Sequence, residues 1–331
     1  MDLSIIIVNW NSKDFVQACI RSIRARTFTT SFEVVVVDNA SNDGCGECLA
    51  RDFADVIFVQ SQFNLGFGRA NNLGANHANG EVLLFLNPDT EIQDSAIDRL
   101  HDQFRKLDKP GAIGCRLLNS DGSLQASCVQ ALPTVINQVL DADLLQCLFP
   151  KSGLWGTTAL FDAGNAPSEV EVVSGACLMI GKDVFERVGG FSPDYFMYGE
   201  DLDLCYKARI AGLRNYHVSD ALIVHHGGGS TNRSASNFSD VMMRESVYRF
   251  LRKSRGRLYS GCYRAALSGA AVIRIALLLV LYPVWLARGK VGGWAAAFRK
   301  WFGILRWGLG LERWIRKYDP PEKAAAAGPS R

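Results

Sequence analysis

Apolar and polar positions alternate in blocks along the first 90 residues, with strand-like runs followed by helix-like spacing. Continuous apolar runs predict four strands, at Ser4–Val8, Glu33–Val37, Val56–Val59 and Val82–Leu86. Apolar residues recur at helical spacing over Phe15–Ile23, Cys48–Phe53 and Phe67–Asn76. Strands that alternate with helices form βαβ units, and uninterrupted apolar runs suit strands buried on both faces. The pattern therefore predicts an α/β fold with a mainly parallel, doubly wound, Rossmann-like sheet.

The pattern changes twice further along the chain. Residues 119–168 are rich in turn formers and lack a clear period, which is typical of a long irregular excursion. Regular spacing resumes at Val170–Ile180, continues through a helix at Asp201–Ala211 and reaches a strand and loop at His217–His226. Beyond about residue 237 the chain is basic, apolar and holds five of the seven Trp residues. We therefore expect an α/β domain over 1–240, a helical region over 241–318 and a disordered tail over 319–331.

The charge distribution is asymmetric. The formal net charge is only +3, but residues 244–317 hold 16 Lys and Arg against 2 Asp and Glu. The rest of the chain holds 20 basic and 31 acidic residues. An acidic body with a basic C-terminal region indicates that this region meets an anionic partner, either nucleic acid or an anionic lipid surface. No RNA- or DNA-binding motif accompanies the charge, so we expect lipid and no nucleic acid.

The apolar stretch Ala265–Ala287 carries a single charge, Arg274. Its uninterrupted part, Ile275–Ala287, is too short to span a bilayer alone. Three readings stay open, namely interfacial or re-entrant attachment, a span from which Arg274 snorkels, and a buried core helix. The following stretch, Trp294–Lys317, mixes aromatic with basic residues as interfacial helices do. We expect peripheral or shallowly inserted attachment to a membrane.

The N-terminus and the cysteines bear on location. A strand-like run begins at Leu3, so no secretory signal is visible. The nine Cys residues are scattered among apolar neighbours, as buried thiols are in a reducing cytoplasm. Cys45 and Cys48 form a C-x-x-C pair without a second pair at zinc spacing, which disfavours a metal or redox role. Together with the basic region, this predicts the cytoplasmic face of the inner membrane.

Short polar residues follow each of the first four predicted strands. They are Asn9-Trp10-Asn11, Asp38 to Gly44, Asn64 to Gly68, and Asn87-Pro88-Asp89-Thr90. In an open α/β sheet, ligands bind beyond the carboxyl ends of the strands. Asn, Asp and Gly also dominate ordinary turns, but four successive polar ends at one edge favour a ligand site.

Two aspartates stand out among these residues. Asp38 directly follows a buried strand, where its carboxylate can accept hydrogen bonds from a nucleobase or ribose; capping of a turn is the alternative. Asp89 follows an apolar strand, and Pro88 stiffens its turn. A single carboxylate fixed there suits a hard divalent cation whose other ligands are phosphate oxygens and water. The nearby Gly66-Phe67-Gly68 lacks the third glycine of a dinucleotide-binding motif and follows the third strand rather than the first.

Two later clusters add chemistry. Aromatic residues at Tyr195–Tyr198 precede Glu200, Asp201 and Asp203 at the start of a predicted helix. Acids there can simply favour the helix dipole, which we expect for Asp203, whereas Asp201 suits a general base. The stretch from His225 to Thr231 joins two histidines to a glycine-rich loop, which suggests contact with a metal or a pyrophosphate.

In this order and spacing, the clusters resemble the family 2 glycosyltransferases with the GT-A fold. They are most similar to the rhamnosyltransferase-like branch that builds O-antigens and lipid-linked cell-wall intermediates. The matching stretches are S-I-I-I-V-N-W-N, V-V-D-N-A-S-N-D-G, N-L-G-F-G-R-A-N-N-L-G, L-F-L-N-P-D-T, V-S-G-A-C-L-M-I, V-G-G-F-S-P-D-Y-F-M-Y-G-E-D-L-D-L-C-Y and H-H-G-G-G-S. The resemblance covers residues 3–231 without the irregular excursion.

The resemblance implies a function. It implies an inverting enzyme that moves a sugar, rhamnose being favoured, from a nucleotide-diphosphate sugar to a lipid-linked or polysaccharide acceptor in cell-envelope glycan synthesis. It also implies residue roles. Asp38 would bind the nucleobase side of the donor, and Asn9, Asn11, Asn64, Gly66 and Asn72 would line the nucleotide pocket.

The metal and the base are implied in the same way. Asp89 matches the metal-binding aspartate of the D-x-D signature, with Asn87 where many relatives have the first Asp, so that Asn87 would border the donor. Asp201 matches the catalytic base of the E-D motif. His225 matches the histidine of the H-x-G-G-x-S pattern and would be a second metal ligand. The expected cofactor is Mg²⁺, or Mn²⁺ because one ligand is a nitrogen.

Two other functions fit parts of this pattern. A nucleotidyltransferase can use a similar sheet and metal-binding carboxylates, but it does not need a base after an aromatic run and would release pyrophosphate. A non-catalytic membrane protein that binds sugar nucleotides or glycans is the other alternative. The presence of Asp89, Asp201 and His225 together argues for an enzyme.

Overall fold

The computed structural model describes residues 1–141, 143–161, 166–227 and 237–319. The chain divides into two compact units. Unit 1 comprises residues 1–132, 149–196 and 200–233, and unit 2 comprises 133–148, 197–199 and 234–331. Residues 133–148 of the irregular excursion therefore belong to the same unit as the C-terminal residues. A single boundary near residue 240, as expected from sequence, does not include this exchange. Of the tail expected over 319–331, all but Asp319 lies outside the described residues.

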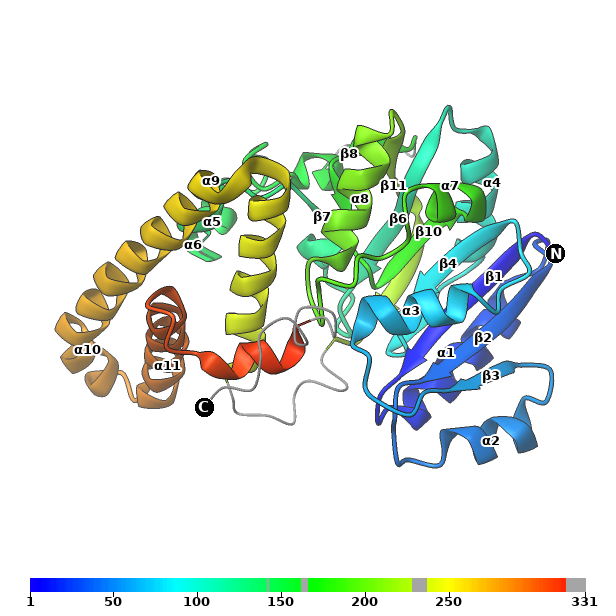
Figure 1. The fold of residues 1–331 in the computed structure, drawn as a ribbon, viewed down its shortest axis with the longest axis horizontal. Coiled ribbons are helices and arrows are strands. Elements are labelled where there is room, and N and C mark those ends of the chain that lie inside the picture. Colours follow the sequence, from blue (N-terminus) through cyan, green and yellow to red (C-terminus); the bar gives the residue numbers. More distant parts are fainter. Residues whose placement is uncertain (142, 162–165, 228–236, 320–331) are drawn as a thin grey trace. The chain divides into compact units, whose positions relative to one another are not determined.

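A nine-stranded mixed sheet forms the centre of unit 1 (Figure 1). Its order is β3-β2-β1-β4-β10-β6-β11-β5, with β8 paired to β11. The strands are β1 (Leu3–Asn9), β2 (Phe32–Asp38), β3 (Ile57–Gln60), β4 (Val82–Leu86), β5 (Thr90–Ile92), β6 (Pro110–Leu118), β8 (Ser168–Val170), β10 (Cys177–Gly181) and β11 (Arg214–His225). β7 (Val129–Gln130) and β9 (Val172–Val173) form a separate antiparallel pair.

The direction of the strands changes across the sheet. β1 to β4 are parallel, as the alternation of strands and helices predicts. β10 then runs antiparallel to both β4 and β6, and β11 is parallel to β6 but antiparallel to β5 and β8. The sheet is thus mixed but mainly parallel, as expected: β1, β2, β3, β4, β6 and β11 share one direction, and β5, β8 and β10 run in the reverse direction.

Helices cover the sheet of unit 1. They are α1 (Lys13–Arg26), α2 (Cys45–Asp52), α3 (Phe67–Ala75), α4 (Ala96–Lys106), α7 (Lys182–Arg187) and α8 (Glu200–Ile210), with short 3-10 helices η1 (Ala126–Cys128) and η2 (Thr157–Phe161). α1 shows why they form: Val16, Cys19, Ile20 and Ile23 recur at helical spacing and are its buried residues. An apolar stripe of this kind stabilises a helix by packing against the core.

Strand register brings the polar strand ends to one edge of the sheet. Asn9 is the register partner of Asp38, and Leu86, the last residue of β4, is the partner of Ile7. Every residue of β1 and β4 is buried, which fixes this register through packing on both faces. The chain therefore leaves β1, β2 and β4 at the same edge, as the interpretation of the polar residues as one site requires.

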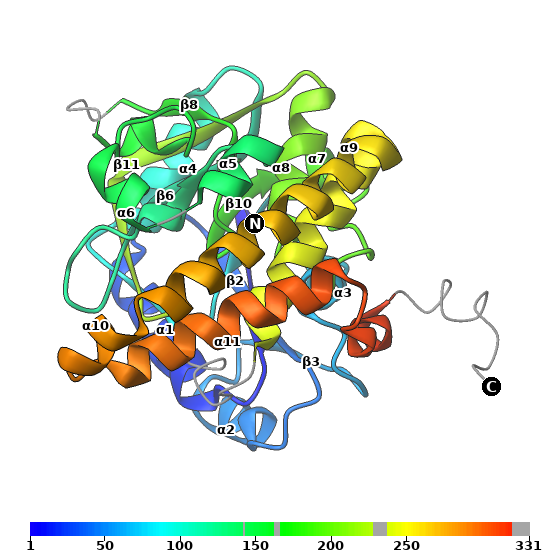
Figure 2. The ribbon, with the colours of Figure 1, turned by 90° about the vertical axis from the view of Figure 1, so that its left-hand side faces the viewer.

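Unit 2 is helical. Its elements are α5 (Val135–Leu140), α6 (Asp143–Leu148), α9 (Phe238–Val280), α10 (Tyr282–Ala287), α11 (Val291–Gly308) and the 3-10 helix η3 (Arg313–Tyr318). α9 bends at Gly256, whose φ of 88° lies in the left-handed region. The second part of α9 and α11 lie side by side (Figure 2). Among the described residues, α9 is the one helix long and apolar enough to cross a membrane by length and composition.

Candidate active site

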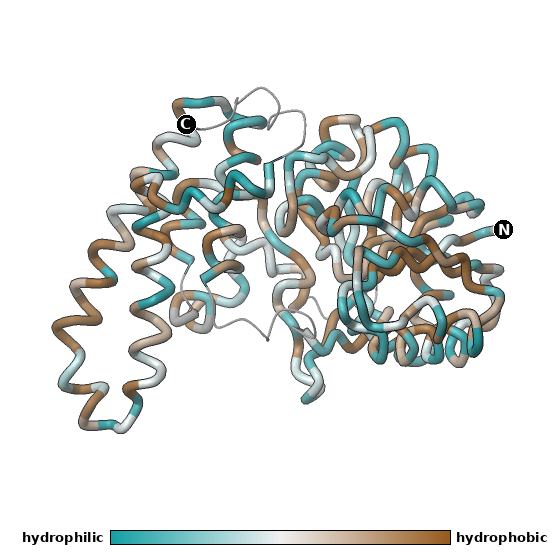
Figure 3. Tube along the Cα trace, turned by 60° about the horizontal axis from the view of Figure 1, so that its bottom comes forward, coloured by the Kyte–Doolittle hydropathy of each residue, from teal (hydrophilic) through white to brown (hydrophobic). Residues whose placement is uncertain are grey.

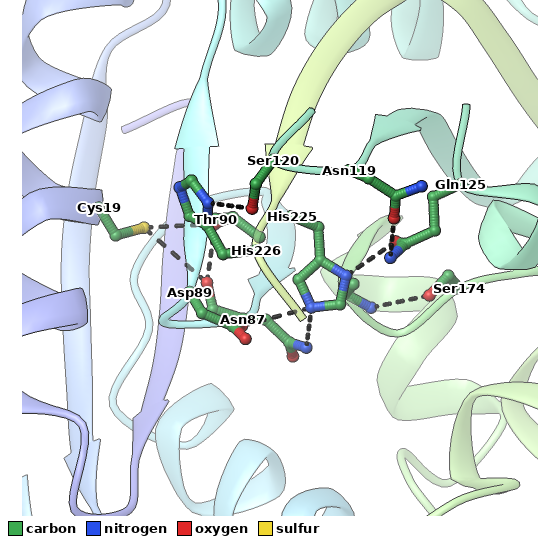
Figure 4. Close-up of polar contacts among 11 residues, drawn as sticks. Cys19, Asn87, Asp89, Thr90, Asn119, Ser120, Gln125, Ser174, His225 and His226 are labelled. Carbon is green, nitrogen blue, oxygen red and sulfur yellow. Dashed lines mark hydrogen bonds and ion pairs between the residues drawn. The ribbon is translucent and has the colours of Figure 1, made fainter. Parts of the chain in front are cut away.

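Asp89 and His225 meet at the polar edge of the sheet of unit 1 (Figure 4). Asp89 lies in the turn between β4 and β5, and His225 is the last residue of β11, which pairs with β5. Asp89 Oδ1 is 3.3 Å from His225 Nε2, and the side-chain amide nitrogen of Asn87 is 3.2 Å from the same atom. Thr90 Oγ1 donates to the carbonyl of Asn87 at 2.7 Å and so tightens the turn. The structure thus brings together the two residues expected to bind a metal.

Gln125 sets the tautomer of His225. The side-chain amide of Gln125 donates through Nε2 to Asn119 Oδ1 at 3.2 Å, which turns its oxygen Oε1 toward His225 Nδ1 at 2.8 Å. An acceptor at Nδ1 requires the proton of the neutral imidazole to be on Nδ1. The lone pair of Nε2 then accepts a hydrogen bond from the side-chain amide of Asn87 and lies beside Asp89 Oδ1. A hydrogen bond to the ring nitrogen that does not bind the metal orients histidine ligands in metal sites.

The pair fits a divalent cation. Asp89 Oδ1 and His225 Nε2 lie 3.3 Å apart, so both atoms can contact one cation. Adjacent ligands of an octahedral ion with bonds of about 2.1 Å lie about 3 Å apart, close to this spacing. Among the described residues, no three His, Cys, Asp or Glu side chains group to hold a metal. Two protein ligands leave the remaining positions to a diphosphate and water, as is common for Mg²⁺.

Replacement of Gln125 tests this arrangement. We expect Gln125→Leu to weaken Mn²⁺ binding by about 10- to 100-fold, as loss of an outer-shell partner typically does. The reason is that Nδ1 of His225 loses its acceptor, so the ring is free to rotate and to change tautomer. Calorimetric titration of the variant with Mn²⁺ in the presence of a nucleoside diphosphate measures the effect. Gln130→Leu, at an exposed position of β7, is the matched control; equal affinity of the two variants would exclude the positioning role.

Asp201 borders the same edge of the sheet. It lies in the first turn of α8, where Oδ2 accepts a hydrogen bond from the amide of Gly175 at 2.9 Å and Oδ1 accepts one from the amide of Leu202 at 2.8 Å. The carbonyl of Ala176, the next residue after Gly175, accepts a hydrogen bond from the amide of Asn87 at 3.0 Å. Burial raises the pKa of Asp201 above its usual value, although the two amides act in the opposite sense. A carboxylate with a raised pKa is a stronger base.

Asp203 has a different environment from Asp201. Its side chain is fully buried and accepts hydrogen bonds from the hydroxyls of Ser192 and Tyr195. Lys207 Nζ, one turn later on α8, lies 3.5 Å from its carboxylate. Asp203 therefore anchors α8 to the segment that precedes it, in keeping with the structural role expected from sequence.

Asp38 lies at the centre of a hydrogen-bond network. Its carboxylate accepts bonds from the side-chain amides of Asn9 and Gln60, both at 2.7 Å, and from the amide of Ser41 at 3.0 Å. Asn9 is fully buried, and its oxygen accepts a bond from the amide of Ser12 at 3.0 Å. Asn9 therefore joins the ends of β1 and β2 and can affect a ligand only through the groups that it holds.

Asn11 lines a shallow pocket next to this network. Asn11 adopts a positive φ of 52°, and its amide donates to Ser41 Oγ at 2.9 Å. The pocket has a volume of about 380 Å³, and its walls are formed by Asn11, Ser12, Lys13, Asp14, Phe15, Asn42 and Asp43. The pocket opens between the residues that follow β1 and those that follow β2.

Asn64 and Gly66 shape the entry to α3. Asn64 Oδ1 accepts bonds from the amide of Gly66 at 2.9 Å and from the side chain of Asn39 at 3.0 Å. Gly66 has a φ of 79°, and a Cβ atom there would lie 2.1 Å from the carbonyl oxygen of Phe196. That carbonyl accepts the amide hydrogen bond of Phe67 at 2.9 Å. Glycine is thus required for close approach of α3 to the segment that leads to Asp201.

Asn72 faces a protein backbone. Its side-chain amide donates to the carbonyl of Phe191 at 2.8 Å, and its oxygen accepts from the amide of Phe191 at 2.9 Å. This paired contact joins α3 to the segment before α8. The expected role of Asn72 in lining the nucleotide pocket stays a prediction, and the contact gives it a structural role as well.

Sequence reasoning missed two residues of the site. Gln125 lies in the irregular excursion, where nothing in the local pattern distinguishes it from other polar residues. Gly175, which binds Asp201, lies in a stretch that matches the family, V-S-G-A-C-L-M-I, and could have been noticed there. A Cβ atom on Gly175 would lie 3.3 Å from Cβ of Asp201, so a larger residue would crowd the carboxylate.

Known proteins that are similar to this chain decide its family. The sequence profile of Glycosyl transferase family 2 matches residues 4–161. An N-acetylglucosaminyl-diphospho-decaprenol L-rhamnosyltransferase from Mycobacterium tuberculosis is 30% identical over 259 residues, which is 74% of this chain and 83% of the relative. The chain belongs to glycosyl transferase family 2. The rhamnosyltransferase WbbL of Escherichia coli is similar to this glycosyltransferase as well, with 22% identity over 260 residues, or 76% and 93% of the two chains.

Solved structures support the fold of this glycosyltransferase. A mannosyltransferase from Pyrobaculum calidifontis, in complex with GDP-Man and Mn²⁺, superposes with a TM-score of 0.56 at 16% identity and covers 94% of this chain and 88% of that chain. GalNAc-T7 with UDP, GalNAc and Mn²⁺ superposes with a TM-score of 0.57 at 17% identity, covering 76% and 48% of the two chains. At such low identity the comparison concerns the fold alone.

Proposed function

We propose that this glycosyltransferase moves a sugar, with inversion, from a nucleotide-diphosphate sugar to a lipid-linked or polysaccharide acceptor in cell-envelope glycan synthesis. The observation that carries the proposal is the meeting of Asp89 and His225, with Asp201 tied to the same edge of the sheet through Gly175 and Ala176. Family membership supports sugar transfer. The acceptor is supported by the M. tuberculosis relative, whose name specifies a diphospho-decaprenol substrate.

Asp201 is the proposed catalytic base. In a single displacement the acceptor oxygen forms a bond to the anomeric carbon, the bond from that carbon to the diphosphate breaks, and the hydroxyl proton passes to the carboxylate of Asp201. The amides of Gly175 and Leu202 hold both carboxylate oxygens, so the base has a fixed orientation. A base that is oriented before the reaction needs little reorganisation in the transition state.

Asp89 and His225 would hold the divalent cation. When bound, the cation neutralises negative charge on the departing diphosphate. Gln125 fixes the orientation of the His225 ring through Nδ1, and the turn closed by Thr90 keeps Asp89 in place. Mn²⁺ and Mg²⁺ both suit a set of one nitrogen and one oxygen ligand completed by phosphate and water.

Asp38 is proposed to bind the nucleobase. A carboxylate has about four acceptor positions, and three hydrogen bonds already reach Asp38, so about one position is left for a donor group of the base. The adjacent pocket beside Asn11 would take part of the nucleotide. Asn64 and Gly66 would border the diphosphate at the start of α3, and Asn87 would lie between the donor and His225.

Rhamnose is the favoured sugar and dTDP the favoured nucleotide. The preference for rhamnose is supported by the rhamnosyltransferases among the relatives, and the preference for dTDP rests only on the resemblance to the rhamnosyltransferase-like branch. A hexosyltransferase of low-salt glycan biosynthesis from Haloferax volcanii is 32% identical over 212 residues, so other hexoses and UDP or GDP are competing donors. A nucleotidyltransferase would instead release pyrophosphate, and the product released from the donor distinguishes the two reactions.

A screen of sugar nucleotides tests the proposal directly. We expect a nucleotide-diphosphate sugar, dTDP-rhamnose first, to raise the thermal unfolding midpoint in the presence of Mn²⁺ and much less without it. A ligand at 100 times its Kd adds about 2.7 kcal/mol to the free energy of unfolding. Nucleoside triphosphates with a sugar 1-phosphate serve as the control pair. Stabilisation by that pair, with release of pyrophosphate, would identify a nucleotidyltransferase instead.

A further inference from the structure

A contiguous apolar face is exposed on the second part of α9 and on α10. Val272, Ile273, Ala276, Leu277 and Val280 recur at helical spacing and are all exposed. The exposed fractions are substantial, from 52% for Val272 to 75% for Val280. The face continues through Leu281, Val284 and Leu286, each exposed by 45% or more. Exposed apolar patches of this extent mark an interaction surface, because contact between apolar side chains and water is unfavourable.

This face belongs to a helical hairpin within unit 2. The indole nitrogen of Trp294, near the start of α11, donates to the carbonyl of Leu278, near the end of α9, at 2.8 Å. At the other end, the guanidinium of Arg264 donates to the carbonyls of Trp307 and Gly308 at 2.7 and 3.0 Å. Late residues of α9 thus meet early residues of α11, so the two helices are antiparallel. The C-terminal end of α11 therefore lies beside the middle of α9, near Arg264.

Arg264 and Arg274, two arginines of α9, have partners within unit 2. Arg274, the single charge of the apolar stretch, donates to the carbonyls of Val139 and Asp141 at 3.0 and 3.3 Å, at the C-terminal end of α5. Its guanidinium also lies 4.1 Å from the ring centroid of Trp301. Arg264 similarly caps the end of α11. Helix C-termini are favourable places for cations, so both guanidinium groups have stabilising partners within unit 2.

Basic residues surround the apolar face. Residues 257–318 contain eleven Lys and Arg and a single acid, Glu312. Glu312 pairs with Arg306, whereas Arg288, Lys290 and Arg299 are exposed and have no ion pair among the described residues. An apolar face bordered by exposed cations matches the two layers of an anionic bilayer, with acyl chains below the phosphates. Figure 3 shows mainly apolar colour along the second part of α9 and both apolar and polar colour near the turn of the hairpin.

We infer that the α9–α11 hairpin lies in the plane of an anionic membrane surface, with the face from Val272 to Leu286 among the acyl chains. Arg288, Lys290 and Arg299 then lie at the level of the lipid phosphates. Insertion with the turn foremost would instead carry Arg288 and Lys290 deepest into the hydrocarbon, where charges are costly. A simple span is incompatible with the antiparallel return of α11. The inference concerns unit 2 alone and does not depend on the proposed reaction.

Vesicle binding by the full chain tests the inference. We expect binding to sedimented vesicles of phosphatidylcholine with phosphatidylglycerol, and much weaker binding to phosphatidylcholine alone. Leu277→Glu combined with Val280→Glu should reduce vesicle binding by about 100-fold or more, because two apolar side chains that would enter the acyl chains are lost. Arg288→Ala with Lys290→Ala should reduce it by about 10-fold or more, and only on the anionic vesicles.

The matched control introduces the same two charges elsewhere. Phe28→Glu with Ile210→Glu alters two residues of unit 1 that are 71% and 67% exposed, and it should leave vesicle binding unchanged. If this control and the hairpin variant bind alike, or if the unaltered chain does not bind vesicles, the inference is wrong. If light scattering without lipid shows an oligomer that only the hairpin variant dissociates, the face is a contact between copies and the inference is also wrong.

Labelling at the turn tests the in-plane orientation. Lys290→Cys is introduced together with Cys262→Ser, since Cys262 is exposed, and the labelling is compared with that of Cys262→Ser alone. A membrane-impermeant maleimide added outside sealed vesicles should modify the new cysteine without detergent. Protection until detergent is added would show that the turn is inserted or translocated, which contradicts the in-plane orientation. Because neither assay measures sugar transfer, failure here is distinct from failure of the proposed function.

Discussion

Replacement of Asp201 by Asn is expected to lower the rate of sugar transfer by about 10²- to 10⁴-fold, the usual contribution of a positioned general base. Asn has the size of Asp but cannot accept the proton of the acceptor hydroxyl. Donor affinity should be nearly unchanged, because the proposed donor contacts are made by other residues. The measurement is the initial rate with saturating donor and Mn²⁺, beside donor binding by calorimetry. A variant that retains more than a tenth of the rate would exclude Asp201 as the base.

The stability of this variant gives an independent check. The raised pKa of Asp201 means that the folded chain binds the proton more tightly than the unfolded chain does. Its ionisation therefore lowers the free energy of unfolding as the pH rises, and Asn, which stays neutral, removes that cost. Asn can accept only one of the two amide hydrogen bonds, which offsets this gain, so we expect a thermal midpoint close to that of the unaltered chain at neutral pH. Asp203→Asn is the contrast, since it breaks a buried pair with Lys207 and should lower the midpoint.

The same shift predicts how the reaction depends on pH. A protonated carboxyl cannot act as a base, so the transfer rate should fall as the pH decreases through the pKa of Asp201. Because burial raises this pKa, the decline should begin at a higher pH than for an ordinary aspartate. In the Asp201→Asn variant this limb of the profile should be absent.

Replacement of Asp89 by Ala is expected to lower transfer by about 10³-fold or more, since a bound cation supplies several kcal/mol of stabilisation to a departing diphosphate. Mn²⁺ should no longer increase the thermal stabilisation given by the sugar nucleotide. His225→Ala should have the same kind of effect, because His225 Nε2 lies 3.3 Å from Asp89 Oδ1 and would bind the same cation. The rate as a function of Mn²⁺ concentration, together with the binding of Mn²⁺ and donor, measures both effects.

The neighbouring histidine provides the control for this experiment. His226 has the same side chain one position later, but it contacts Glu91 at 3.6 Å and Ser120 at 2.9 Å. His226→Ala should therefore retain activation by Mn²⁺. If Asp89→Ala and His226→Ala behave alike, the pair of Asp89 and His225 does not bind the cation.

Much of unit 1 could be predicted from sequence because its elements are defined locally. β4 occupies the predicted residues Val82–Leu86, and α3 ends within one residue of its predicted end, since buried strands and amphipathic helices have strong periods. The antiparallel entry of β10 between β4 and β6 could not be predicted. A short apolar strand such as Cys177–Gly181 does not encode its direction, which depends on partners about 60 to 100 residues earlier in the chain.

The candidate site also contains residues that sequence could identify and one residue that it could not. Asp38, Asp89, Asp201 and His225 stand at ends of regular elements or in family motifs, so sequence alone could propose them. Gln125 acts through a contact with His225 that is 100 residues away along the chain, and such a contact depends on tertiary structure alone. The pairing of residues 133–148 with the C-terminal helices escaped the sequence interpretation for the same reason.

That pairing has a consequence for biosynthesis. Gln138 accepts a hydrogen bond from Arg244, which is 106 residues later, and the amide of Val135 donates to the hydroxyl of Tyr259, which is 124 residues later. At a translation speed of 5–20 residues per second, α5 waits on the order of 10 s for these partners to leave the ribosome. A nascent chain that stalls in this interval would present an unpaired segment to chaperones and proteases, so the last helices determine when the earlier excursion becomes protected.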